Sequence, residues 1–160
     1  MKSDNPFQVG DWVETRPVAE VLATLDDQAS TDALLFMPEM VRFCGHRFQV
    51  AEPVQRGRAL RRDPVVPRLA EAVNLETYCD GSGHDGCEGR CLMFWNAAWL
   101  RVADGPVADQ PPPPAEETAG IEWLEAAARL PARAGATRYR WPVHAARPGC
   151  RDPAGCGHTA

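Results

Sequence analysis

The sequence has no apolar run that approaches the roughly 20 residues needed for a membrane-spanning helix. Its first ten residues are polar and lack the apolar centre of a secretory signal peptide. We therefore expect no membrane association and a cytoplasmic location. Thiols stay reduced in that compartment and structural disulfides are rare, so the six cysteines are first considered as metal ligands or reactive thiols.

Basic charge is also scarce. The chain has 22 acidic residues against 17 lysines and arginines, which gives a net charge of −5. Nucleic-acid binding generally depends on a basic field, so this balance argues against a nucleic-acid partner. The arginines clustered within 56–68 are expected to lie in a solvated loop. The alternative for that loop is docking of an acidic protein partner or a small anionic substrate.

Signatures of several enzyme classes are missing. There is no Ser-His-Asp arrangement, no phosphate-binding glycine loop and no Rossmann fingerprint, so hydrolase, kinase and dinucleotide-dependent functions have no support. The remaining candidates for acid–base catalysis are His46, His84 and Asp85, with Asp80 and Glu39 as further acidic groups. Each has a simpler interpretation as a structural or solvated residue. The sequence leaves open whether the protein is an enzyme.

Proline and glycine, with 15 and 13 residues, argue against long helices. Apolar and polar residues alternate in three short segments, as they do in half-buried strands. These segments are residues 7–16, 46–52 and 72–78. Helical spacing predicts short helices at 18–25 and 38–43, and the apolar segment 92–100 predicts another short helix before a strand at 100–102.

We expect a mostly β fold with short helices (α+β), built as a small, partly open SH3-like barrel that carries a cysteine-ligated metal loop. The Gly-Asp turn at 10–11 before an alternating strand is typical of the first strand of such a barrel. The metal-binding core domain is expected to span residues 1–104. A proline-rich linker (105–119) and a short helix with an irregular, extended C-terminal tail (120–160) follow.

The expected terminal helix has Ile121, Leu124 and Ala128 on one side. The tail beyond the linker is expected either to be disordered or to lie over the core domain, with Trp123 and Trp141 as its anchors.

Four cysteines form the most informative pattern. Cys79, Cys87 and Cys91 have the spacing C-x7-C-x3-C in a glycine-rich loop, and glycine permits the positive φ angles that turn several thiolates toward one point. Cys44, at the end of an expected short helix, is the favoured fourth ligand. The alternative ligand is His84, which could instead donate a hydrogen bond to a sulfur.

The spacing also bears on the metal. Structural zinc sites usually contain two C-x2–4-C pairs, whereas these cysteines are separated by three and seven residues, and Cys44 lies 35 positions before Cys79. Iron–sulfur clusters accept wider and less regular spacing. We therefore predict a [4Fe–4S] cluster, which Phe94, Trp95 and Trp99 could shield from water. A Zn2+ ion is the alternative cofactor, and buried thiols without a metal are the third interpretation.

Cys150 and Cys156 lie in the C-terminal tail, where few apolar residues surround them. We expect these two cysteines to be solvent-exposed thiols rather than ligands of the same centre.

Four sequence words carry a family resemblance. They are Gly10-Asp-Trp-Val-Glu14, Phe36-Met-Pro-Glu-Met40, Cys44-Gly-x-Arg-Phe-x-Val50 and His84-x-Gly-Cys-x3-Cys-x2-Phe-Trp95. Together they resemble a family of small, poorly characterised bacterial proteins with four cysteines, over residues 7–103. The resemblance implies that the four cysteines belong to one recurring pattern, and it implies no particular activity.

Two functions remain as hypotheses. The first is an iron–sulfur protein that acts in electron transfer, or as a small cluster-dependent enzyme of bacterial metabolism, with a protein partner or a small-molecule substrate. The second is a zinc-stapled, SH3-like protein-interaction module without catalysis.

Overall fold

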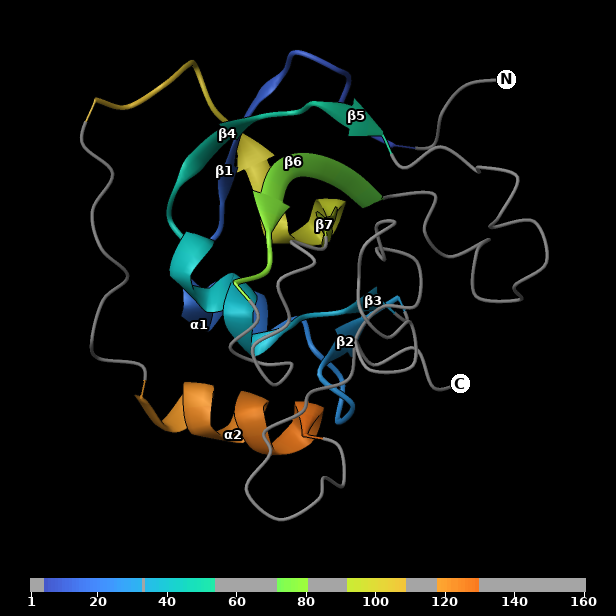
Figure 1. Ribbon diagram of the computed structural model, residues 1–160, viewed down its shortest axis with the longest axis vertical. Helices are drawn as coiled ribbons and strands as arrows, with labels where there is room; N and C mark the ends of the chain where they lie inside the picture. The colour runs from blue at the N-terminus through green and yellow to red at the C-terminus, as the bar shows by residue number, and fades with distance from the viewer. Residues whose placement is uncertain (1–4, 33, 54–71, 81–91, 109–117, 130–160) are drawn as a thin grey trace, which may run out of the picture.

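The computed structural model describes residues 5–32, 34–53, 72–80, 92–108 and 118–129 (Figure 1). Within these ranges, short antiparallel strands form two three-stranded sheets and one two-stranded sheet, with few helices. The expected mixed, mainly β character is therefore confirmed at this level.

The first three-stranded sheet has β1 (Trp12–Thr15) at its centre, between β4 (Arg47–Gln49) and β8 (Leu100–Val102). Both pairings are antiparallel. Val13 and Thr15 are fully buried, whereas Trp12 and Glu14, which alternate with them, are half-buried. The alternation that predicted a strand here thus places one face of β1 in the core.

The second three-stranded sheet consists of β5 (Glu52–Pro53), β6 (Ala72–Tyr78) and β7 (Leu92–Asn96), in that order. The predicted strand at 72–78 is confirmed as β6. The predicted strand at 46–52 is divided into β4 and β5, which belong to different sheets.

Strand β6 is irregular in its middle. Four positions separate Asn74 and Tyr78, whereas only two separate their partners Phe94 and Leu92, so β6 carries extra residues that bulge from the ladder. Glu76 lies in this bulge with a φ of 54°, and its backbone N–H donates to the Asn74 side chain at 2.7 Å.

The helix predicted at 92–100 is wrong for most of its length. Residues 92–96 form strand β7, and only η4 (Ala97–Trp99) makes a single 3-10 turn before β8. Alternation explains the strand, because Met93 and Trp95 are buried. Asn96 begins the turn by accepting a hydrogen bond from the Ala98 N–H at 2.8 Å.

Two short connections join the two three-stranded sheets. The chain passes from β4 to β5 through Val50 and Ala51, and the Ala51 N–H donates to the Asn74 carbonyl at 3.0 Å. It also passes from β7 through η4 directly into β8. The described strands do not form one closed barrel.

The segment between β1 and β4 supplies most of the remaining elements. It contains α1 (Val18–Leu22), β2 (Ser30–Thr31), β3 (Leu34–Leu35) and the 3-10 helix η1 (Pro38–Phe43). The helix predicted at 38–43 is therefore present, and α1 is shorter than the predicted 18–25. Gly45 follows η1 with a φ of 77°, the left-handed conformation expected there.

Aromatic side chains fill the centre of the core. The Phe36 ring lies edge-on to the rings of Trp95 and Trp99, with centroid distances of 6.1 and 5.1 Å. All three side chains are fully buried. This cluster connects the β2–β3 region with β7 and η4, so the inserted segment shares a core with the sheets.

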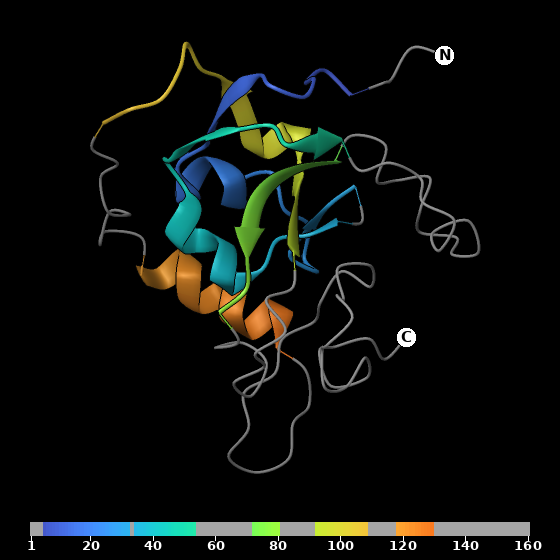
Figure 2. The same ribbon diagram turned by 45° about the horizontal axis from the view of Figure 1, so that its top comes forward.

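Helix α2 (Thr118–Ala128) packs against η1 and α1, on the side of them that faces away from the β5–β6–β7 sheet (Figure 2). Leu124 and Ala128 are fully buried on the expected apolar side of the helix, whereas Trp123 is 42% exposed and is less enclosed than they are. The predicted tail beyond it, at 130–160, lies outside the described residues. No helix in the described ranges has the length and apolar character to cross a membrane.

Candidate metal centre

The structure describes two of the four predicted cysteine ligands, Cys44 and Cys79. Cys87 and Cys91 lie outside the described residues, as do Cys150 and Cys156. Cys44 is 2% exposed and Cys79 is 4% exposed, and both belong to the same core cluster. Two cysteines 35 positions apart in the sequence are thus buried in one core.

The end of η1 fixes the position of Cys44. Its backbone N–H donates to the Val41 carbonyl at 3.1 Å, and its Sγ lies 3.9 Å from the Met40 carbonyl oxygen. The following residue, Gly45, donates its N–H to the Thr15 carbonyl at 2.9 Å. The turn that carries Cys44 is therefore held both by its own helix and by β1.

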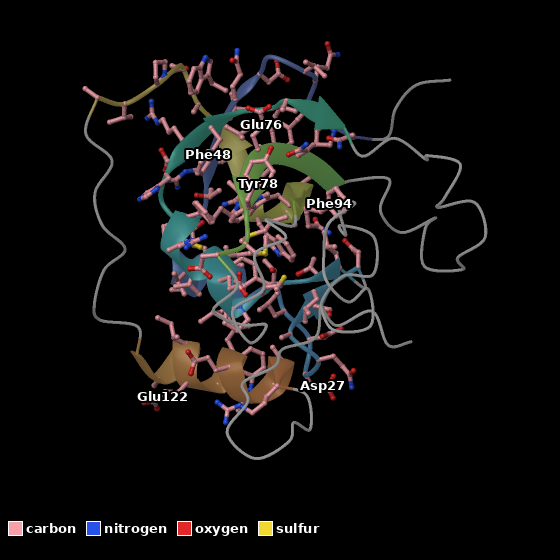
Figure 3. The ribbon with its side chains drawn as sticks, viewed as in Figure 1. Asp27, Phe48, Glu76, Tyr78, Phe94 and Glu122 are labelled. Carbon is pink, nitrogen blue, oxygen red and sulfur yellow. The ribbon has the colours of Figure 1, made fainter. Side chains whose placement is uncertain are left out.

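Cys79 follows directly after β6 and continues the alternation of that strand. Val73, Leu75, Thr77 and Cys79 are all buried, with exposed fractions of 0–4%. Glu76, by contrast, is exposed; Figure 3 labels it together with Tyr78 of the same strand. The period of two explains why the Cys79 side chain turns toward the core.

Arg42 connects the two cysteine-bearing segments. Its Nη1 donates to Asp80 Oδ2 at 2.5 Å, and its Nη2 donates to the Tyr78 carbonyl at 2.9 Å. Tyr78 and Asp80 flank Cys79, while Arg42 lies two residues before Cys44. The end of η1 and the end of β6 are therefore tied together by one side chain.

The cysteine environment bears directly on metal chemistry. Thiolate sulfur is the ligand form, and a charged group buried in a core is costly unless it is paired or bound to a metal. Burial of Cys44 and Cys79 fits metal ligands, and it also fits neutral thiols that pack as small apolar side chains. Among the described residues, no three His, Cys, Asp or Glu side chains form a group that could hold a metal, so a full site needs ligands from the undescribed segments.

The weak catalytic candidates are placed as follows. His46 is half-buried, and its ring lies 6.4 Å from the Phe48 ring at an angle of 34°. Asp80 forms the ion pair with Arg42, and Glu39 is buried within η1. His84 and Asp85 lie outside the described residues, so their candidacy for acid–base catalysis stays a prediction.

A separate charged cluster covers the β4–β1–β8 sheet. Glu14 accepts hydrogen bonds from Arg101 and from Arg47, the latter at 3.1 Å. The hydrogen bond from Arg101 lowers the pKa of Glu14 below its usual value of 4.5, burial partly opposes this, and Arg47 adds to the lowering. This cluster involves none of the cysteine-bearing segments.

Comparison with known proteins gives no family assignment. Neither models of protein families, nor curated proteins, nor solved structures match this chain. The resemblance to small bacterial four-cysteine proteins therefore stays a prediction.

Sequence reasoning did not single out Arg42. Its only signal was a basic residue in the last turn of a predicted helix, where cations are generally favourable. Neither Asp80 nor the Tyr78 carbonyl could be recognised as its partner, because both are 36 or more positions away. The arginine cluster within 56–68, which the sequence did single out, lies outside the described residues.

Proposed function

We propose that this protein binds a [4Fe–4S] cluster through Cys44, Cys79, Cys87 and Cys91 and acts in electron transfer or as a small cluster-dependent enzyme. The observation that carries the proposal is the burial of Cys44 and Cys79 in one core, on segments that Arg42 ties together. The proposal takes these two soft thiol side chains, from distant parts of the chain, as two of the four ligands.

The strand pairing supports the participation of the other two cysteines. Leu92, the residue after Cys91, pairs with Tyr78, the residue before Cys79. Because neighbouring Cα atoms are only about 3.8 Å apart, the cysteine loop must leave and rejoin the structure beside this pair. The described chain therefore leaves and rejoins the structure at this pair, next to Cys79.

The surroundings favour a centre that is protected from water. The Phe43 ring, next to Cys44, lies 6.4 Å from the fully buried Trp95 ring. Trp95 belongs to β7, whose pairing with β6 positions Cys79. Burial is one of the features by which a protein sets the potential of such a cluster.

In this proposal the protein holds the ligands, excludes water and keeps the end of η1 and the end of β6 in a fixed relative position. The bound cluster would supply a one-electron redox couple, accepting an electron from a reduced carrier protein and passing it to an oxidised one. An enzymatic role would in addition need a substrate site next to the cluster.

A zinc-stapled interaction module is the second candidate, and one observation favours it. Cys44 lies just before β4 of one sheet, and Cys79 lies just after β6 of the other. A single ion between them would tie the two small sheets together. Pairing of β1 with both β4 and β8, and the 3-10 turn before β8, support the SH3-like, partly open barrel proposed as its framework.

The test is the metal content of protein purified without oxygen. We expect brown protein that contains iron and acid-labile sulfide and has broad visible absorption. Colourless protein with one equivalent of zinc would refute the [4Fe–4S] cluster and support the zinc-stapled module. Protein with neither metal would refute both proposals.

The ligand assignment is tested by single substitutions. Cys44→Ser and Cys79→Ser are expected to abolish stoichiometric metal binding, because serine is a poor ligand for soft ions. Cys150→Ser and Cys156→Ser are the matched controls and should keep the full metal content. Loss of the metal in the control variants, with retention in Cys44→Ser, would overturn the assignment.

A further inference from the structure

We propose that Arg42 is a positioning residue of the cysteine centre, which sets the distance between Cys44 and Cys79. This inference rests on the metal centre proposed above. It concerns a side chain that binds no metal itself and acts through the backbone segments that carry the ligands.

The guanidinium group is held from three sides. Nη1 and Nη2 donate to Asp80 Oδ2 and to the Tyr78 carbonyl, at 2.5 and 2.9 Å. Its central carbon lies 4.7 Å from the centre of the Phe43 ring, in the range of a cation–π contact. With two fixed acceptors and one ring face, the group has a defined orientation, although the Arg42 side chain is 41% exposed.

The location of the two acceptors makes this geometry relevant to the ligands. Tyr78 and Asp80 are the residues on either side of Cys79, and Arg42 is separated from Cys44 by Phe43 alone. A shift of the Arg42 contacts therefore moves the Tyr78 backbone and the Asp80 side chain, one on each side of Cys79, relative to the end of η1. Partners outside the ligand set orient metal ligands in this way in many sites.

The chemistry of arginine suits this role. The planar guanidinium group can donate to two acceptors at once in a fixed geometry. The lysine ammonium is a compact charge without this fixed two-donor geometry, so it binds the same two acceptors less specifically. Asp80 offsets most of the positive charge of Arg42, so the effect on the centre is mainly geometric. An ion pair with side chains 41% and 45% exposed contributes little to global stability.

The experiment compares metal release and folding in the same variants. Arg42→Gln removes the ion pair, and Arg42→Lys keeps the charge but not the two-acceptor fork. The matched control is Arg16→Gln, since the Arg16–Glu20 ion pair has similar exposed fractions of 36% and 46% and involves neither cysteine segment. The full-length protein, as purified without oxygen, is mixed with excess chelator, and release of its iron or zinc is followed over time.

We expect Arg42→Gln to release the metal about 10- to 100-fold faster than the original protein, the range typical of loss of such a partner. Arg42→Lys should be intermediate, and Arg16→Gln should be unchanged. The midpoints of thermal unfolding of the metal-free Arg42→Gln and Arg16→Gln proteins should fall by similar amounts. A release rate for Arg42→Gln within about twofold of the original would overturn the inference, as would a selective loss of metal-free stability that accounts for faster release.

A second variant covers the case in which Arg42→Gln does not fold. Asp80→Asn retains the Arg42 bond to the Tyr78 carbonyl and removes one charge, so faster release than in Arg16→Gln is again expected. Unchanged release in Asp80→Asn would then overturn the inference. If the original protein contains no metal, or if Cys44→Ser retains it, the proposed function fails irrespective of Arg42, so the two failures are distinguishable.

Discussion

The Trp95 indole Nε1 donates a hydrogen bond of 2.8 Å to Thr77 Oγ1. In the strand register, however, Trp95 is paired with Val73, four positions before Thr77. The bulge around Glu76 shortens the path of β6 and brings Thr77 within reach of the indole. One irregularity of β6 thus satisfies the polar atom of the largest buried side chain, two residues before Cys79.

We expect Thr77→Val to destabilise the protein by about 1–3 kcal/mol, because the isosteric side chain leaves the buried indole N–H without an acceptor. Thr77→Ser keeps the hydroxyl group and loses only a methyl group, so it should cost less. Chemical unfolding monitored by tryptophan fluorescence measures both changes. Equal losses in the two variants would show that packing of the methyl group, rather than the hydrogen bond, is what matters.

The Glu14 cluster predicts a dependence of stability on pH. The pKa of Glu14 is lowered in the folded protein, so its contribution is fully present above the unfolded value of 4.5 and is lost as the pH falls through the folded pKa. Glu14→Gln should therefore lower the free energy of unfolding at neutral pH by about 1 kcal/mol, and the difference should shrink as the pH falls below 4.5.

The measurement is a series of urea unfolding curves of both proteins between neutral and acidic pH. Glu122→Gln removes the same charge from an exposed position on the outer side of α2 and corrects for the change in net charge (Figure 3). A difference between Glu14→Gln and the original protein that grows at acidic pH would contradict this role of Glu14.

The contact between Gly120 and Leu22 tests whether α2 is packed on the core in solution. A Cβ atom at position 120 would lie 2.5 Å from Leu22 Cδ1, so the leucine must move to accept it. Alanine otherwise stabilises a helix by up to about 1 kcal/mol relative to glycine. Gly120→Ala should therefore gain little in the original protein and more in a Leu22→Ala background.

Unfolding free energies of the two single variants and the double variant give the coupling between the positions. We expect a coupling of at least about 0.5 kcal/mol, as for other residues in direct contact. The same effect of Gly120→Ala in both backgrounds would place α2 away from α1.

The sequence predicted the elements whose pattern is local. The period of two in 72–78 indicated a strand and its buried face, and it also turns Cys79 inward. The sequence pattern was misleading at 92–96, where the density of the apolar residues Met93, Phe94 and Trp95 was interpreted as a helix. Pairing with β6 decides that segment, and such pairing depends on residues far away in the sequence.

For the candidate site too, local features could be predicted from the sequence and long-range contacts could not. Cysteine spacing and the glycine after Cys44 indicated which thiols to consider, and Gly45 has the expected left-handed φ of 77°. The hydrogen bonds from Arg42 to Tyr78 and Asp80, on either side of Cys79, could not be predicted, because they form only after η1 and β6 have packed together. Residues that hold ligands in place often come from such tertiary contacts and leave little trace in spacing.

Removal of the metal should loosen one part of the protein more than the rest. Two of the proposed ligands, Cys44 and Cys79, follow the end of η1 and the end of β6, and metal binding contributes directly to the stability of the segments that it joins. The Cys44 and Gly45 backbone N–H groups are bonded to Val41 and Thr15, so their exchange with solvent reports on this junction. We expect their protection to fall sharply in the metal-free protein.

The control for this loosening lies in the same sheet but away from the cysteines. The Ala103 N–H donates to the Trp12 carbonyl at 2.9 Å, beside the pairing of β1 with β8. Hydrogen–deuterium exchange followed by mass spectrometry can compare a peptide covering 38–50 with one covering 98–108, before and after chelation. Faster exchange confined to 38–50 is the expected result, because the junction loses its ligand while the β1–β8 pairing keeps all its hydrogen bonds. Equal acceleration in both peptides would instead mean that the metal supports the whole fold, as expected for a zinc staple in a small core.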